Sequence, residues 1–123
     1  MRSPEKVVLA FNACINSRDL AGLAALMTEA HVFTDSAGVS VRGKSACVSA
    51  WDRFFLSFPD YQNVFEQVVV TGRSVSIVGR SLCSDNRLAG RALWRAEVEG
   101  ERIATWRVCK DTPALRRDLG LPT

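Results

Sequence analysis

The chain has 123 residues, of which 47% are hydrophobic and 24% charged. This is the usual size of one domain with one core, and the composition is too apolar for disorder, so we expect a single domain over residues 1–123. The net charge of +3 comes from basic residues scattered along the chain, which predicts no nucleic-acid binding. No apolar run approaches the length that crosses a bilayer, so no membrane segment is expected.

Two helices are predicted in the first 30 residues. Ser3, Pro4 and Glu5 form a strong helix start, with a capping side chain, a proline at the first helical position and an early carboxylate. Apolar residues follow at helical spacing as far as Ile15. Residues 16–19 interrupt this pattern, and Asp19 is expected to cap a second, shorter helix that ends near Thr28.

A strand and a third helix follow. The short apolar run 31–34 predicts the strand, and Asp35 to Gly38 predicts a turn after it. A return strand is predicted over 39–41, and the third helix is expected to begin near Gly43 and to stop at Pro59. Its apolar face carries Val48, Trp51, Phe54, Phe55 and Phe58. So many aromatic side chains on one short helix indicate core, a cavity wall or an interface.

The second half of the chain predicts a meander of antiparallel strands. The hydrophobic period changes to two, which predicts strands over 65–70, 74–84, 90–99 and 102–110 with hairpin turns between them. A short helical turn is predicted over 113–119. Three helices followed by such a meander indicate an α+β fold.

Alternation assigns the faces of the last two strands. Trp94 and Trp106 are predicted to share the face toward the helices, among small residues. They either wall a cavity or fill the core, and the sequence leaves both readings open. The opposite face is predicted to carry Leu93, Ile103 and Cys109 together with Arg91, Arg95 and Arg107.

The cysteines argue against a metal or cofactor site. Cys14, Cys47, Cys83 and Cys109 show no C-x-x-C spacing, and the chain has one histidine. Free thiols suit a reducing compartment, and Pro4 and Glu5 stand where a signal peptide needs an apolar stretch, so a cytoplasmic protein is expected. No nucleotide motif is present either.

The layout resembles the nuclear transport factor 2-like superfamily, and within it the SnoaL-like polyketide cyclases and ketosteroid isomerases. The resemblance rests on residues 16–19 between two helices, 27–32 leading into a strand, Asp35 and Gly38 after it, and 42–44 opening the third helix. It implies an α+β, cystatin-like fold in which a curved antiparallel sheet forms a cone around three N-terminal helices. The pocket of such a fold opens inside the cone, and the outer sheet face often forms a homodimer.

The resemblance also implies roles for single residues. The general-base Asp of the isomerases matches Asp35. Their oxyanion hole uses a Tyr, which matches Phe11, and a late Asp, which matches Trp94, while a supporting Tyr matches Trp51. Because losing one oxyanion donor costs about 3–4 kcal/mol of transition-state stabilisation, steroid isomerisation is not expected. A cyclase that works on a more acidic substrate stays open.

The favoured function is therefore a protein that binds a small apolar ligand or substrate and uses Asp35 as general base on a ketone. The alternative is a non-catalytic ligand-binding or dimerisation domain, in which Asp35 only begins a turn. His31, Tyr61 and Arg80 are candidate partners of the carboxylate. The residues expected to line the pocket are Phe11, Ile15, Trp51, Phe55, Phe58, Tyr61, Trp94 and Trp106.

Overall fold

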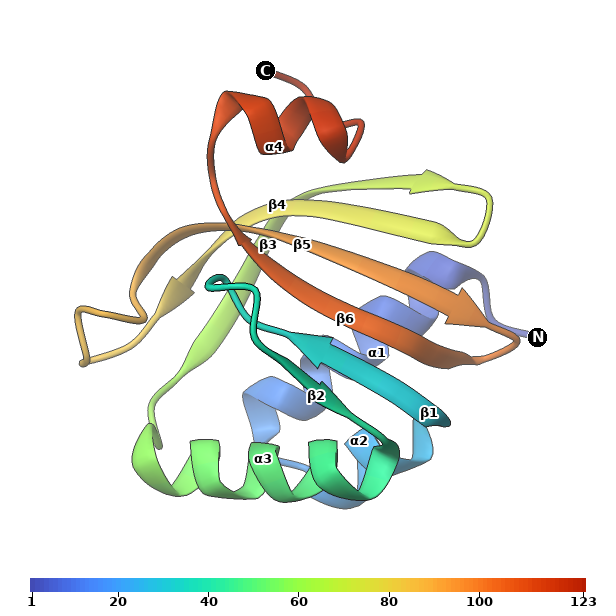
Figure 1. The fold of residues 1–123 in the computed structure, drawn as a ribbon, viewed down its shortest axis with the longest axis vertical. Coiled ribbons are helices and arrows are strands. Elements are labelled where there is room, and N and C mark those ends of the chain that lie inside the picture. Colours follow the sequence, from blue (N-terminus) through green and yellow to red (C-terminus); the bar gives the residue numbers. More distant parts are fainter.

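The computed structural model describes residues 1–123 as one six-stranded sheet with four helices (Figure 1). The strand order is β2-β1-β6-β5-β4-β3, and all neighbours are antiparallel except β1 and β6, which are parallel. Helices α1 to α3 lie on one side of the curved sheet and α4 on the other. The elements are α1 (Pro4–Ser17), α2 (Leu20–Ala25), β1 (Met27–Thr34), β2 (Ser40–Arg42), α3 (Lys44–Ser57), β3 (Gln62–Thr71), β4 (Ser74–Leu82), β5 (Gly90–Glu99), β6 (Arg102–Lys110) and α4 (Pro113–Asp118).

The helix starts follow the predicted capping chemistry. Ser3 accepts a hydrogen bond from the backbone N–H of Lys6 at 3.3 Å, and Asp19 accepts one from Gly22 at 2.9 Å. Helix α2 is shorter than predicted, because Met27 already belongs to β1 and is fully buried opposite Ile103. Pairing with the last strand overrides the helical spacing at this point.

A β-bulge corrects the predicted faces of β6. Glu97 pairs with Thr105 and Val98 pairs with Ile103, so Ala104 has no partner across the ladder. The extra residue reverses the alternation, and Ile103 is fully buried in the main core with Trp94 and Trp106. The expectation that Ile103 lies on the outer face was therefore wrong, whereas the shared inner face of the two tryptophans is confirmed.

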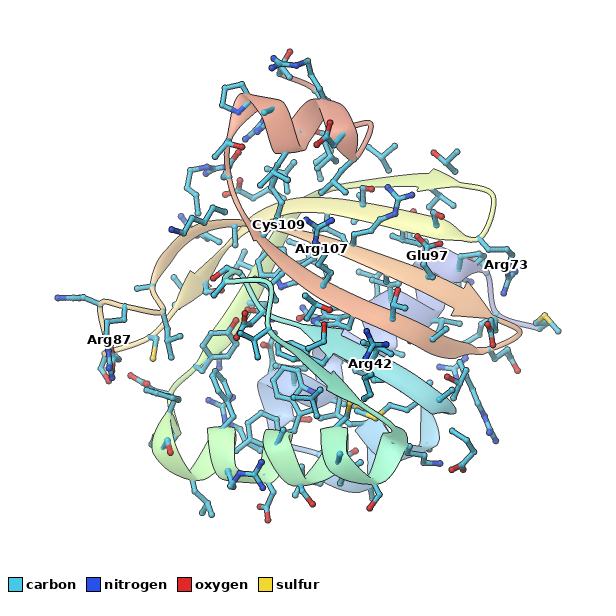
Figure 2. The ribbon with its side chains drawn as sticks, viewed as in Figure 1. Arg42, Arg73, Arg87, Glu97, Arg107 and Cys109 are labelled. Atoms are coloured by element: carbon cyan, nitrogen blue, oxygen red, sulfur yellow. The ribbon has the colours of Figure 1, made fainter.

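The C-terminal segment covers part of the outer sheet face. Leu119 and Leu121 pack with Val78, Leu93 and Cys109 in a second, smaller core. Leu93 and Cys109 are thus buried within the chain and are not exposed for a partner, contrary to the sequence-based expectation. Arg42, Arg107 and Glu97 lie on the same face beyond this core (Figure 2). None of the four helices is long and apolar enough to cross a membrane.

Candidate functional site

A cavity of about 360 Å³ lies between α3 and the inner face of the sheet. Its volume falls within the range of small-molecule sites, and its wall is predominantly apolar. The side chains come from six regions of the chain, including the turn after β1 and the last two strands. The lining residues are Phe33, Asp35, Ser36, Ala37, Val41, Cys47, Ala50, Trp51, Phe54, Tyr61, Asn63, Leu88, Trp94, Trp106 and Val108.

Half of the predicted aromatic and aliphatic lining lies in this wall. Trp51, Tyr61, Trp94 and Trp106 border the cavity. The other four residues belong to or pack against the main core without bordering the cavity: Phe11, Ile15, Phe55 and Phe58.

Two of these residues pack against rings of the wall. The Phe11 ring lies 4.7 Å from that of Trp106, and the Phe55 ring lies 5.5 Å from that of Trp51. Phe54, which comes one turn after Trp51 on α3, takes the lining position that the sequence interpretation gave to Phe55.

Asp35 both builds a turn and borders the cavity. Its Oδ1 accepts hydrogen bonds from the backbone N–H groups of Ala37 at 2.9 Å and Val39 at 3.0 Å. Gly38 closes the turn with a φ of 85°, a conformation that suits glycine. The carboxyl Oδ2 has no hydrogen-bond partner within the turn or elsewhere in the protein. The geometry is therefore compatible with both interpretations of Asp35, the general base and the first residue of a turn.

Three of the side chains that border the cavity carry unpaired donors. The indole N–H groups of Trp51, Trp94 and Trp106 are buried, and none has a hydrogen-bond acceptor. A buried N–H without an acceptor costs about 1–3 kcal/mol. The rings are held by other aromatic side chains, such as Phe65, which lies 5.1 Å from Trp94 between ring centroids. The three tryptophans thus border the cavity and carry buried indole N–H groups that have no acceptor in the protein.

A buried polar network forms another part of the site. The Tyr61 hydroxyl lies 3.1 Å from Ser81 Oγ, which donates to Asn63 Oδ1 at 3.0 Å. Asn63 in turn donates to Asn12 Oδ1 at 3.2 Å, and Asn16 bonds both backbone groups of Asn63. Burial raises the pKa of the Tyr61 phenol above its usual value, so the phenol is neutral. Sequence patterns missed this network, because its members are far apart in the chain.

The remaining candidate partners of Asp35 lie elsewhere. His31 is fully buried in the core and is not a rim residue. Its Nδ1–H donates to the carbonyl of Ile103 at 2.6 Å, and burial lowers its pKa. Arg80 is exposed and does not border the cavity. No group of three or more His, Cys, Asp or Glu side chains is placed to hold a metal ion.

Comparisons with known proteins agree with this architecture. The sequence matches the family model of the SnoaL-like domain over residues 8–106. No match was found among curated proteins. Among solved structures, a candidate SnoaL-like polyketide cyclase from Shewanella putrefaciens is similar, with a TM-score of 0.78, 13% identity, and 98% of each chain covered.

Two further structures show the same fold. A cystatin-fold protein from Novosphingobium aromaticivorans gives a TM-score of 0.78 at 17% identity, covering 89% of this chain and 100% of that one. A nuclear transport factor 2-like protein from Cytophaga hutchinsonii gives 0.75 at 16% identity, covering 94% and 96%. The family match spans most of the chain, and the chain belongs to the SnoaL-like domain family.

Proposed function

We propose that the chain binds an apolar ligand that carries a ketone, and that Asp35 moves a proton at the carbon next to the carbonyl. The observation that carries this proposal is the composition of one cavity wall. The residues that border the cavity include a carboxylate whose Oδ2 has no partner in the protein and three tryptophans whose buried indole N–H groups lack acceptors. A general base and donors for a developing oxyanion are the two requirements of enolisation.

In the proposed step, the Asp35 carboxylate accepts a proton from the carbon adjacent to the carbonyl. The electron pair of the broken C–H bond moves into the new C=C bond, and the carbonyl π pair becomes an enolate oxygen. That oxygen accepts a hydrogen bond from an indole N–H of the wall. Asp35 then returns the proton to another carbon atom of the ligand. Alternatively, the enolate carbon attacks a second carbonyl, whose π pair becomes an alkoxide oxygen, and that oxygen takes the proton back from Asp35. Neither route needs an oxidant or a reductant.

The second candidate is ligand binding without catalysis. Asp35 accepts two backbone hydrogen bonds in its turn, so the turn alone explains its presence. Trp94 and Trp106 likewise contribute to the main core whether or not a ligand enters. The two candidates share the ligand and differ only in proton transfer.

An exchange experiment separates the candidates without knowledge of the natural substrate. α-Tetralone is incubated with the protein in D₂O, and loss of its α-proton signal is followed by NMR. Catalysis predicts that the wild type speeds deuterium uptake and that Asp35→Asn slows it by about 10²–10⁴-fold, the usual contribution of a general base. Asparagine keeps the Oδ1 acceptor that the turn needs. Asp52→Asn, at an exposed position of α3 beside Trp51, is the matched control and is expected to match the wild type.

Binding is measured in parallel from tryptophan fluorescence, since all three tryptophans of the chain border the cavity. Binding of α-tetralone without faster exchange would support the binding-only function. Equal exchange by wild type and Asp35→Asn would refute the base role. Absence of both binding and exchange would contradict the ketone-ligand proposal.

A further inference from the structure

Only one assignment of donors and acceptors satisfies the buried hydrogen-bond network of Tyr61, Ser81, Asn63 and Asn12. The side-chain amide of Asn12 donates through Nδ2 to the backbone carbonyl of Asn63, at 3.4 Å. A carbonyl only accepts, so the Nδ2 of Asn12 must face it and Oδ1 must face the Asn63 side chain. Asn63 therefore presents Nδ2 to Asn12, at 3.2 Å, and turns its own Oδ1 to Ser81.

The same logic fixes the hydroxyl protons. Because Asn63 Oδ1 only accepts, the Ser81 hydroxyl must donate its single proton to that oxygen, at 3.0 Å. Ser81 Oγ can then only accept from Tyr61, whose hydroxyl lies 3.1 Å away. All three side chains are buried, at 3% to 7% exposure. The single proton of the Tyr61 hydroxyl is thus directed away from a ligand.

We propose that Tyr61 meets the ligand as a hydrogen-bond acceptor, so that the cavity selects ligands presenting a hydroxyl or N–H group to this part of the wall. This inference rests on the proposed ligand function of the cavity, which Tyr61 and Asn63 both border. The phenol oxygen keeps lone pairs when its proton is bound to Ser81. The ligand class is an apolar ring system with a phenol, enol or alcohol hydroxyl.

Two matched compounds test this assignment. 2-Naphthol carries a hydroxyl, and 2-methoxynaphthalene replaces the hydroxyl proton with a methyl group, so that only an acceptor remains. Affinity of each is measured by tryptophan fluorescence for the wild type, Tyr61→Phe and Ser76→Ala. Ser76 lies on β4 like Ser81, but its Oγ bonds Arg95 and does not border the cavity, so its variant is the control.

The wild type is expected to bind 2-naphthol about 2- to 12-fold more tightly than the ether, which is the net value of one hydrogen bond. Tyr61→Phe should lose this preference by weakening 2-naphthol alone, and Ser76→Ala should keep it. If Tyr61→Phe weakens the ether as much as 2-naphthol, Tyr61 donates to the ligand and the assignment is wrong. If the preference survives in Tyr61→Phe, another acceptor is responsible and the assignment is again wrong.

The outcomes also separate this assignment from the proposed function. Equal binding of both compounds to the wild type overturns the role of Tyr61 and leaves the ligand cavity intact. No binding of either compound, while α-tetralone binds, likewise overturns the role of Tyr61 alone, whereas the failure of α-tetralone to bind as well overturns the proposed function too. A second measurement does not need a variant, because Tyr61 is the single tyrosine of the chain. Its hydroxyl proton should give an NMR contact to Ser81 with and without 2-naphthol, and transfer of that proton to the ligand would contradict the inference.

Discussion

Lowering the pH from 7.5 to 5.5 is expected to destabilise the fold through His31, the single histidine of the chain. His31 is fully buried, and its Nδ1–H donates to the Ile103 carbonyl while Nε2 has no hydrogen-bond partner. Protonation would place a charge and an unpaired N–H in the core. Burial therefore lowers the pKa of His31 in the folded chain.

Low pH destabilises the fold because the unfolded chain binds the His31 proton at a higher pH than the folded chain does. In the unfolded chain histidine titrates near pH 6.5, whereas in the folded chain the pKa is lower. As the pH falls below about 6.5, the unfolded chain binds a proton that the folded chain does not, so the free energy of unfolding decreases by at most about 1.4 kcal/mol per pH unit. Between pH 7.5 and 5.5 the loss from this residue is at most ~1.4 kcal/mol, and it stops growing below the folded pKa.

Urea unfolding at pH 7.5, 6.5 and 5.5 measures this loss in the wild type and in His31→Asn. Asparagine offers an N–H close to the position of Nδ1 but does not titrate. The variant is expected to be less stable at every pH, because the core loses an aromatic ring, yet its free energy of unfolding should lack the histidine contribution to the pH dependence. Equal pH slopes for both proteins would refute the reasoning, since His31 would then titrate alike in the folded and unfolded chain.

Two further predictions concern packing. Gly79→Ala is expected to reduce the free energy of unfolding by about 1–3 kcal/mol, because the new Cβ would lie 2.1 Å from the backbone oxygen of Val64; an unchanged urea midpoint would show that β3 moves aside at no cost. Leu121→Ala is expected to cost about 2–5 kcal/mol and to speed thiol labelling of Cys109, which it helps to cover, while Cys47 stays protected. An unchanged labelling rate, followed by mass spectrometry, would contradict the covering role of the C-terminal segment.

The sequence predicts the parts of this fold that depend on local rules. The caps at Ser3 and Asp19 were predicted because each interaction lies within three residues of the cap. The hairpins of the second half were predicted because alternation and turn residues are local as well. The bulge at Ala104 was missed, since one extra residue leaves no composition signal and yet reverses the face of Ile103. Local sequence patterns identify the strands, but they do not show where one strand of a pair contains an extra residue.

The same distinction explains what was found and missed in the site. The resemblance identified Asp35, and alternation placed Trp94 and Trp106 on the inner face, where both border the cavity. The burial of His31 was missed because a lone histidine at the start of the predicted strand has no local signature, whereas in the structure it lies inside β1. The network behind Tyr61 was missed because it joins residues 18 to 51 positions apart, and only the folded sheet and α1 bring them together.

The two proposals together restrict the ligand more than either does alone. Asp35 and Tyr61 supply acceptors, whereas the indoles of the wall supply donors that have no partner in the protein. A ligand with only a carbonyl would satisfy the donors and leave the Tyr61 oxygen unused, and a ligand with only a hydroxyl would leave the indoles unused. An apolar ring system that carries both groups should therefore bind best, and 6-hydroxy-1-tetralone is expected to bind more tightly than α-tetralone. Tyr61→Phe should remove that advantage without reducing the affinity for α-tetralone itself. A ketone has no proton to donate, so α-tetralone forms no hydrogen bond to the phenol oxygen.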